Sequence, residues 1–257
     1  MQNIQNMKIP ILLAMAFALA SVHALELSDG QATEIGRRIW KNECAGTVSG
    51  LTSWNAGEDF ASLGIGHFIW YPAGRRGPFE ESFPGLVRFL KTNGQPVKDW
   101  MLGPCPWNSR AEFLGDANGQ RLTDLRALLA GTVSLQARHA AMRLESALPK
   151  MLAAAPSGER AKVEANFRRV AGEPLGYYAL MDYVNFKGEG TNPSERYRGA
   201  GWGLLQVLAG MKSGPALPAF SRSADEVLTL RVKNSPPERN EAKWLPGWRN
   251  RLKTYLE

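Results

Sequence analysis

The chain of 257 residues is poor in cysteine and histidine, with two of the first and three of the second. Two cysteines are too few for a disulfide-stapled scaffold. The histidines, cysteines and carboxylates show no metal-ligand spacing, so the sequence predicts neither a metal site nor any other cofactor. It also lacks a serine nucleophile elbow, a phosphate-cradling glycine loop, internal repeats and low-complexity stretches. These absences argue against α/β-hydrolases, P-loop enzymes and repeat proteins.

The composition is that of a folded chain with a mild basic bias. Hydrophobic residues make up 44%, which is enough to bury a core, and 31 basic residues face 24 acidic ones. The positive charge is spread along the chain and is not interleaved with aromatic residues in clusters. We therefore expect an anionic polymer or surface as partner, and no nucleic acid.

The first 24 residues resemble a secretory signal. Lys8 is their only charged residue, an apolar run follows over 9–20, and Val22 and Ala24 fit the small-residue rule for cleavage after Ala24. Cleavage after Ala20 is the alternative. The run is short and is interrupted by Pro10, so we expect no stable membrane insertion. Residues 25–257 would then act in the periplasm or outside the cell with a net charge of +6.

Export would place the two cysteines in an oxidising compartment. Cys44 and Cys105 can form a disulfide there, and we expect that pairing.

Helical periodicity dominates the exported part of the chain. Ser28 and Gln31 form a capping box, and apolar residues follow at helical spacing to about Cys44. Two further capping boxes are predicted at 109–112 and 223–226. Helical patterns cover residues 121–130, 132–154, 159–171, 175–187 and 238–256.

Segment 46–78 differs because it is rich in glycine and in short β-prone runs such as 68–71. We expect a small sheet there. The predicted fold is α+β and mostly α, as one domain over 25–257 with a small β lobe after the first helix. The groove between two such lobes is a natural ligand site.

Glu43 is the first candidate for chemistry. At helical spacing it lies about 40° from Ile39 around the helix axis, at the end of the apolar face. A carboxyl group placed there loses contact with water, which suits proton donation near neutrality. The competing interpretation is a structural glutamate that caps a loop or pairs with an arginine.

The run Ser62-Leu63-Gly64-Ile65-Gly66-His67 follows at the end of the predicted hairpin. Together with the helix-terminal Glu43, it resembles the lysozyme-like superfamily, most closely the phage-type lysozymes, over residues 32–70. Those enzymes carry a Thr-Ile-Gly-Ile-Gly-His-like run, so Ser62 replaces threonine.

The resemblance implies roles for individual residues. Glu43 would be the general acid, Ser62 would position water, and His67 would support the base of the hairpin beside the substrate. Glu58 is preferred over Asp59 as the second carboxylate, with Asp59 then contacting substrate. The distance from Glu43 to Ser62 along the chain is longer than in that family.

A second group of residues, Asn185, Glu189 and Gln206, competes with the first. A helix-terminal glutamate followed by Gly-Leu-x-Gln resembles the lytic transglycosylases, in which one glutamate acts as acid and base. In that family, however, the glutamate precedes the sheet. These three residues could instead line the far wall of the groove or hold a buried turn.

Aromatic residues near the hairpin are candidates for stacking on sugar rings. Trp70 and Tyr71 are the main ones, although aromatic residues at strand spacing more often belong to the core.

Together with the predicted signal segment, the resemblance to lysozymes implies an exported peptidoglycan-strand hydrolase. Peptidoglycan or a related polysaccharide suits the positive charge, whereas chitosan, a polycation, would be repelled. The alternatives are a lytic transglycosylase that uses Glu189 and a non-catalytic lysozyme-like protein that binds the cell wall.

Overall fold

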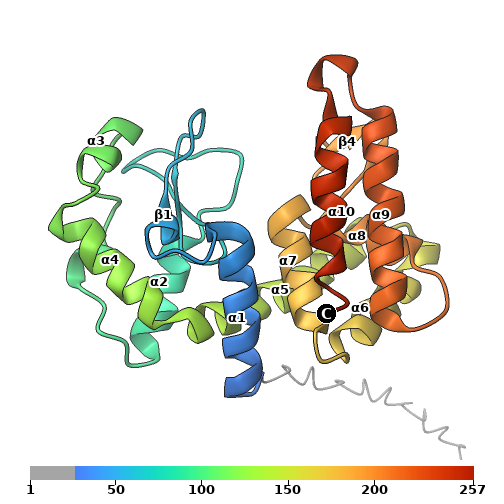
Figure 1. The fold of residues 1–257 in the computed structure, drawn as a ribbon, viewed down its shortest axis with the longest axis horizontal. Coiled ribbons are helices and arrows are strands. Elements are labelled where there is room, and N and C mark those ends of the chain that lie inside the picture. The colour runs from blue at the N-terminus through green and yellow to red at the C-terminus, as the bar shows by residue number, and fades with distance from the viewer. Residues whose placement is uncertain (1–26) are drawn as a thin grey trace, which may run out of the picture.

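The computed structural model describes residues 27–257, so the predicted signal segment lies outside the described residues. The fold is mostly helical with two small antiparallel sheets, which confirms the predicted α+β class. Two lobes stand side by side in Figure 1, and the long helix α5 (Val133–Ala154) runs between them.

Helix α1 (Asp29–Cys44) begins at the predicted capping box. The Ser28 hydroxyl accepts from the Gln31 backbone N–H at 3.2 Å, and the Gln31 side chain accepts from the Ser28 N–H at 3.0 Å. The apolar face of α1 is buried and packs chiefly on α5. The helix ends where Ala45 turns into the left-handed region, so Glu43 lies in its last turn, against the protein body.

The first lobe is built on a three-stranded antiparallel sheet. A 3-10 turn (Ser49–Leu51) leads into β1 (Thr52–Ser53), which pairs with β2 (Ala61–Leu63), which pairs with β3 (Phe68–Trp70). Ser62 lies opposite Ser53 on one side and Ile69 on the other. The remaining elements of this lobe are α2 (Phe83–Thr92), a 3-10 turn (Asp99–Leu102), α3 (Arg110–Gly115) and α4 (Gln120–Gly131).

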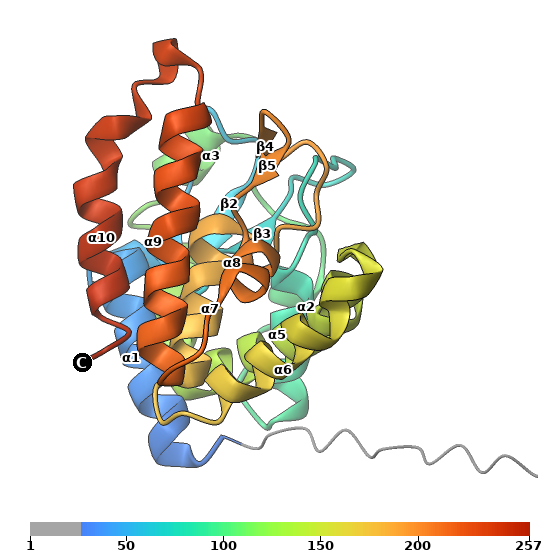
Figure 2. The same ribbon diagram turned by 90° about the vertical axis from the view of Figure 1, so that its right-hand side faces the viewer.

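The second lobe is helical. It contains α6 (Arg160–Ala171), α7 (Gly176–Lys187), α8 (Leu204–Gly210), α9 (Ala216–Asn234) and α10 (Leu245–Lys253). A short hairpin of β4 (Arg196–Tyr197) and β5 (Ala200–Gly201) lies between α7 and α8, and 3-10 turns occupy Ser157–Glu159, Pro237–Arg239 and Glu241–Trp244. Helices α9 and α10 run alongside each other, as Figure 2 shows.

Several helix boundaries differ from the prediction. Ser109 caps α3 as expected, since its hydroxyl accepts from the Glu112 N–H at 3.2 Å. The capping box predicted at 223–226 is wrong, because these residues lie inside α9. The buried Ser223 hydroxyl donates instead to the Val207 carbonyl of α8 at 2.7 Å. The last helix starts at Leu245 after two 3-10 turns, later than the predicted residue 238.

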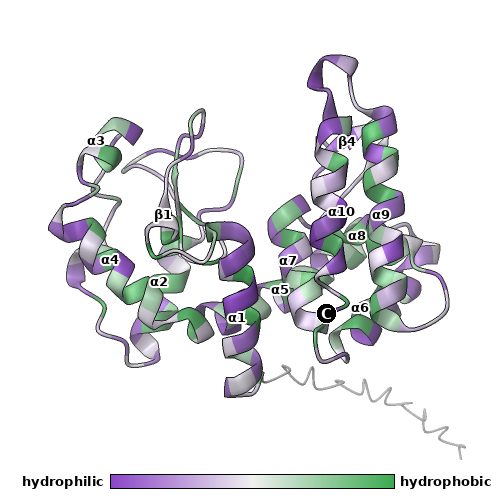
Figure 3. Ribbon diagram, in the orientation of Figure 1, coloured by the Kyte–Doolittle hydropathy of each residue, from purple (hydrophilic) through white to green (hydrophobic). Residues whose placement is uncertain are grey.

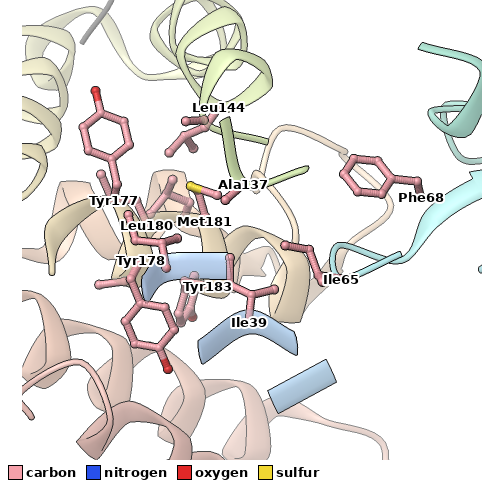
Figure 4. Packing of buried hydrophobic residues seen from close by; sticks show 14 of the residues in the cluster. Ile39, Ile65, Phe68, Ala137, Leu144, Tyr177, Tyr178, Leu180, Met181 and Tyr183 are labelled. Atoms are coloured by element: carbon pink, nitrogen blue, oxygen red, sulfur yellow. The ribbon is translucent and has the colours of Figure 1, made fainter. Parts of the chain in front are cut away.

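A single hydrophobic core runs from one lobe into the other. Figure 3 shows hydrophobic and hydrophilic residues alternating along the helices, as expected for helices with one buried face. Side chains from α1, α5, α7 and the loop after β2 gather at the junction, among them Ile39, Ile65 and Tyr183 (Figure 4). Among residues 27–257, no helix has the length and hydrophobicity needed to cross a membrane.

Candidate active site

A cleft of about 800 Å³ lies between the lobes. The sheet lobe contributes residues of 55–82 to its lining, and α5 contributes residues of 140–150. The helical lobe contributes the end of α7, the loop after it, Arg231 of α9 and Arg239 of the 3-10 turn after α9. The cleft carries charges of both signs, from Glu58, Glu80, Glu189, Glu195, Arg143, Lys150, Lys187, Arg231 and Arg239.

The run 62–67 is held against α5 by one buried glutamine. Gln136 accepts from the Ile65 N–H at 3.0 Å and donates to the Leu129 carbonyl at 2.6 Å. Gly64 has φ +70°, and a Cβ there would lie 2.3 Å from the Gln136 Oε1. The position therefore requires glycine both for its conformation and for close approach.

Ser62, Gly66 and His67 of this run line the cleft. A Cβ on Gly66 would lie 3.7 Å from the Asn185 Nδ2 of α7, so the two lobes come close together here. Asn185 also lines the cleft, which is one of the placements that the sequence left open for the second group of residues. His67 has φ +48°, a left-handed conformation that non-glycine residues seldom adopt.

Glu43 lies directly behind His67. Its Oε2 is 3.7 Å from the His67 Nδ1, and 11% of its side chain is exposed against 35% for His67. The neighbouring Cys44 thiol donates to the Gly64 carbonyl at 3.6 Å. The tertiary structure thus joins the end of α1 to the run 62–67. Glu43 contacts His67, which lines the cleft, but Glu43 itself is not part of the lining.

Glu43 also takes part in a buried ion-pair network. Arg251 of α10 donates to its Oε1 and to both carboxylate oxygens of Asp182, which is fully buried on α7. Burial disfavours the charge on Arg251, but the bonds and charge of Asp182, together with Glu43, outweigh it and raise the pKa of Arg251. The pairing of Glu43 with an arginine is the structural role that the sequence left open.

Glu189 occupies a rigid loop on the helical wall. Gly188 and Gly190 both have φ +81°, and the loop carbonyls of Gly188 and Glu189 accept from the first amides of α8 at 3.0 and 2.9 Å. Gln206 closes the loop, because its Nε2 donates to the Gly190 carbonyl at 3.1 Å. Its Oε1 accepts from the Gly203 N–H at 2.9 Å. The side chain of Gln206 therefore builds the loop and does not line the cleft.

The Glu189 carboxylate is half-buried in the cleft. Burial raises the pKa of Glu189. The nearby charge of Lys150 lowers this pKa, and that of Glu80 raises it, but both effects are smaller than that of burial. Within the described part of the chain, the Glu189 carboxylate has neither a hydrogen bond nor an ion pair. This carboxyl group keeps its proton to a higher pH than an exposed glutamate does.

Of the two carboxylates predicted on the hairpin, Glu58 lines the cleft and Asp59 does not. The Glu58 Oε2 accepts from the Asn55 Nδ2 at 3.1 Å, which orients it at the rim. Asp59 is exposed outside the cleft.

The predicted stacking residues lie in the core. Trp70 is 1% exposed and Tyr71 is 3% exposed, and neither lines the cleft. Trp70 packs on Phe83, Trp100 and Trp107, because its side chain points to the buried face of the sheet. The cleft presents other rings, including Phe79, which is 51% exposed, and Trp202. Phe79 follows a glycine-proline pair in a loop, and no periodicity marks it.

The predicted disulfide is absent. Cys44 and Cys105 are free, buried thiols, and Cys105 donates to the Trp107 carbonyl at 3.5 Å while Cys44 bonds to Gly64. Each thiol therefore belongs to a different local packing arrangement. Within residues 27–257, no three histidine, cysteine or acidic side chains gather closely enough to hold a metal ion.

Comparisons of the chain with protein-family models, with curated proteins and with solved structures gave no match. The candidate function therefore depends on the geometry of the cleft and on the resemblance of residues 32–70 to the lysozyme-like superfamily.

Proposed function

We propose that this protein is an exported enzyme that hydrolyses the β-1,4-glycosidic bonds of peptidoglycan or a related polysaccharide in the cleft between its lobes. The observation that carries this proposal is the 3.7 Å approach of Glu43 to His67. The end of α1 and the run 62–67, the two segments on which the resemblance to lysozymes depends, therefore lie together, and His67 of this run lines the cleft.

In the proposed reaction, Glu43 leaves its pair with Arg251 when it takes up a proton, and it then donates this proton to the glycosidic oxygen as the bond to the anomeric carbon breaks. Water adds to that carbon, and its released proton passes to a carboxylate of the cleft. Glu58 is the second carboxylate, acting on the positive charge that develops on the sugar ring. Ser62, which lines the same wall, orients the water.

Three features support a glycan as substrate. The cleft is open and has a volume of about 800 Å³, its lining mixes carboxylates with aromatic rings such as Phe79 and Trp202, and the exported chain carries a net positive charge. Aromatic faces stack on sugar rings, and a basic protein is attracted to a wall with anionic peptides. An open cleft also favours an enzyme over a lysozyme-like protein whose groove is filled by side chains.

The test is mass analysis of soluble products from peptidoglycan incubated with residues 25–257. Glu43→Gln is the decisive variant, because glutamine keeps the shape of the side chain but cannot donate a carboxylic proton. We expect it to lose about 100-fold or more of the activity. Glu34→Gln, on the exposed face of the same helix, is the matched control and keeps full activity. Full activity of Glu43→Gln contradicts the proposed acid.

A lytic transglycosylase is the second candidate, favoured by the environment of Glu189. Its carboxyl group has a raised pKa and no partner among the described residues, as expected of a group that must gain and lose a proton. In this reaction Glu189 protonates the glycosidic oxygen and then takes the proton of the sugar's own hydroxyl, which closes an anhydro ring. Anhydro ends that vanish with Glu189→Gln support this candidate. Reducing ends that vanish with Glu43→Gln support the hydrolase.

The non-catalytic alternative makes a separate prediction. Tight binding to peptidoglycan with no soluble product from the unchanged protein would support it.

The proposed export is tested by intact mass and N-terminal sequencing of the protein recovered from the periplasm and medium. A chain that begins at Leu25 supports cleavage after Ala24, whereas retention of Met1 contradicts it.

A further inference from the structure

At the helical-lobe side of the cleft, the amino group of Lys187 is paired with no acidic side chain of the described residues. It is the last residue of α7, is half-buried and lines the cleft. Its Nζ lies 3.9 Å from the centre of the Phe186 ring and 3.6 Å from that of the Trp248 ring. No ion pair or hydrogen bond of this ammonium occurs within residues 27–257, so it is held there by the two ring faces.

Two arginines beside it share one carboxylate. Arg231 donates to both oxygens of the buried Glu241 at 2.7 and 3.0 Å, and Arg239 donates to one of them at 3.1 Å. Both arginines line the cleft, and Arg231 also lies over the Trp202 ring at 4.1 Å. One carboxylate balances two guanidinium groups here, so the Arg231–Arg239–Glu241 cluster carries one net positive charge before Lys187 is counted. The carboxylates of Glu189 and Glu195 line the same wall of the cleft, beyond this cluster.

We propose that Lys187, Arg231 and Arg239 form a subsite that binds a carboxylate carried by the glycan substrate. This inference rests on the proposed function, since it assigns a feature of the substrate to one region of the same cleft. A single carboxylate suits the site, because the guanidinium groups are already engaged by Glu241 and one ammonium remains available. The rings of Phe186 and Trp202, which line the cleft, provide apolar contact for the atoms attached to that carboxylate.

The electrostatics of Lys187 agree with this geometry. Burial lowers its pKa to about 7, with Arg231 and Arg251 acting in the same direction and Glu241 opposing them. A carboxylate placed against the ammonium stabilises the charged form. Binding of the anion and protonation of Lys187 therefore reinforce each other.

Two parts of a wall polymer carry such a group: the acidic substituent of the sugar itself and the peptide attached to it. Three probes separate them. Glycan strands with peptides carry the peptide carboxylates, strands stripped of peptides carry only the acid on the sugar, and neutral chitin oligosaccharides carry neither. Affinities are measured by titration of tryptophan fluorescence. The titrations use whichever of Glu43→Gln and Glu189→Gln abolishes cleavage, so that the probes stay intact. If the unchanged protein does not cleave, it is used directly.

Lys187→Met is the principal variant, since methionine keeps an unbranched apolar chain between the two rings. We expect its affinity for at least one carboxylate-bearing probe to fall about 10-fold, and that for neutral chitin oligosaccharides to change less than about two-fold. Lys187→Arg should restore most of the binding. Arg239→Gln, which leaves the Arg231–Glu241 pair in place, should give a smaller loss of the same selectivity.

The control is Lys243→Met. Lys243 also lies over a tryptophan ring, 5.0 Å from that of Trp244, but outside the cleft. It should bind all three probes as the parent protein does. Circular dichroism and a thermal melt establish that each variant is folded.

The results separate this inference from the proposed function. Equal losses for all three probes, or no loss for any, overturn the carboxylate subsite. If the unchanged protein cleaves peptidoglycan while Lys187→Met shows either of those patterns, the inference alone fails. If the selective loss occurs but no variant or parent releases products, the subsite stands and the proposed hydrolysis fails. Whichever carboxylate probe loses more affinity identifies the source of the group.

Discussion

The Arg251 guanidinium on α10 donates two hydrogen bonds to the carboxylate of Asp182 on α7, at 2.7 and 2.8 Å. Asp182 is fully buried and also accepts from the Tyr255 hydroxyl at 2.7 Å and from Asn42 at 3.1 Å. Since Arg251 contacts Glu43 as well, this network ties the last helix to the end of α1. The Asp182 carboxylate is thus a buried charge whose two oxygens both accept hydrogen bonds.

Removal of the cation from this network should be strongly destabilising. Arg251→Met leaves Asp182 buried without its ion pair, and we expect the free energy of unfolding to fall by about 3–5 kcal/mol. Arg249→Met is the matched control on the same helix, because Arg249 pairs with Asp225 at 2.7 Å on the surface. It should cost about 1 kcal/mol or less. Urea denaturation measures both, and equal losses would show that burial of Asp182 is not the cause.

His139 should make the fold sensitive to acid. Burial between the rings of Phe68 and Phe89, followed by the charge of Arg143, lowers its pKa to about 4, and its Nε2 has no partner in the described residues. Below the unfolded-state pKa of about 6.5, the unfolded chain binds a proton that the folded chain does not bind until about pH 4. Stability is therefore present above pH 6.5 and is lost as the pH falls through this window, by about 2–3 kcal/mol.

The measurement is a series of urea denaturation curves between pH 4 and pH 7. His139→Leu cannot bind the proton, so its stability should fall less over this range than that of the unchanged protein. Parallel pH profiles for the two proteins would contradict the assignment to His139.

The two cysteines should behave as inert thiols. Burial raises the pKa of Cys44 to about 12, with a contribution from Glu43, and that of Cys105 to about 11. Because the thiolate is the reactive form, a thiol reagent at pH 8 should label neither residue in the folded protein and both in denaturant. The intact mass should be the same with and without reductant. A loss of two protons in the unreduced protein would instead indicate the disulfide that export first suggested.

Gly203 should be essential to the loop that carries Glu189. A Cβ at this position would lie 2.2 Å from the Gly190 backbone nitrogen. The atoms in the way belong to the backbone, so relieving the overlap requires the loop itself to shift. Gly203→Ala should lower the stability by about 1–3 kcal/mol and speed exchange of the amides of Leu204 and Leu205, which bond to this loop. Gly247→Ala, where a Cβ meets nothing within 4 Å, is the control and should be neutral or slightly stabilising. A thermal melt and hydrogen exchange distinguish the two.

The local features of the candidate site could be predicted from the sequence. Ser28 and Gln31 form the expected capping box, and Glu43 lies at the end of the apolar face of its helix. The glycine-rich segment forms the expected sheet, with Ser62 on its middle strand. These features depend on neighbours within a few residues, and helical and strand periodicity record such neighbours directly.

The predictions that were wrong concern features that depend on contacts with distant parts of the chain. Trp70 and Tyr71 are both buried. Trp70 is covered by Phe83, Trp100 and Trp107 from later parts of the chain, and a strand pattern does not indicate such contacts. Ser223 has the spacing of a helix cap, yet it lies inside α9 because the preceding turns continue the helix and α8 accepts its hydroxyl. The disulfide required knowledge of where two thiols lie in space, and the packing around each one keeps it separate.

The sequence by itself determined the order and type of most elements, the position of Glu43 at a helix end and the glycine at position 64. Only the tertiary structure decided which charges meet. Arg251 contacts Glu43 although 208 residues separate them in the sequence. Lys187 lies between the rings of Phe186 and Trp248. Glu189 lines the cleft, and its carboxylate has no partner among the described residues. Backbone conformation follows from local sterics and hydrogen bonds, whereas the environment of a charged group follows from the packing of segments that the sequence keeps far apart.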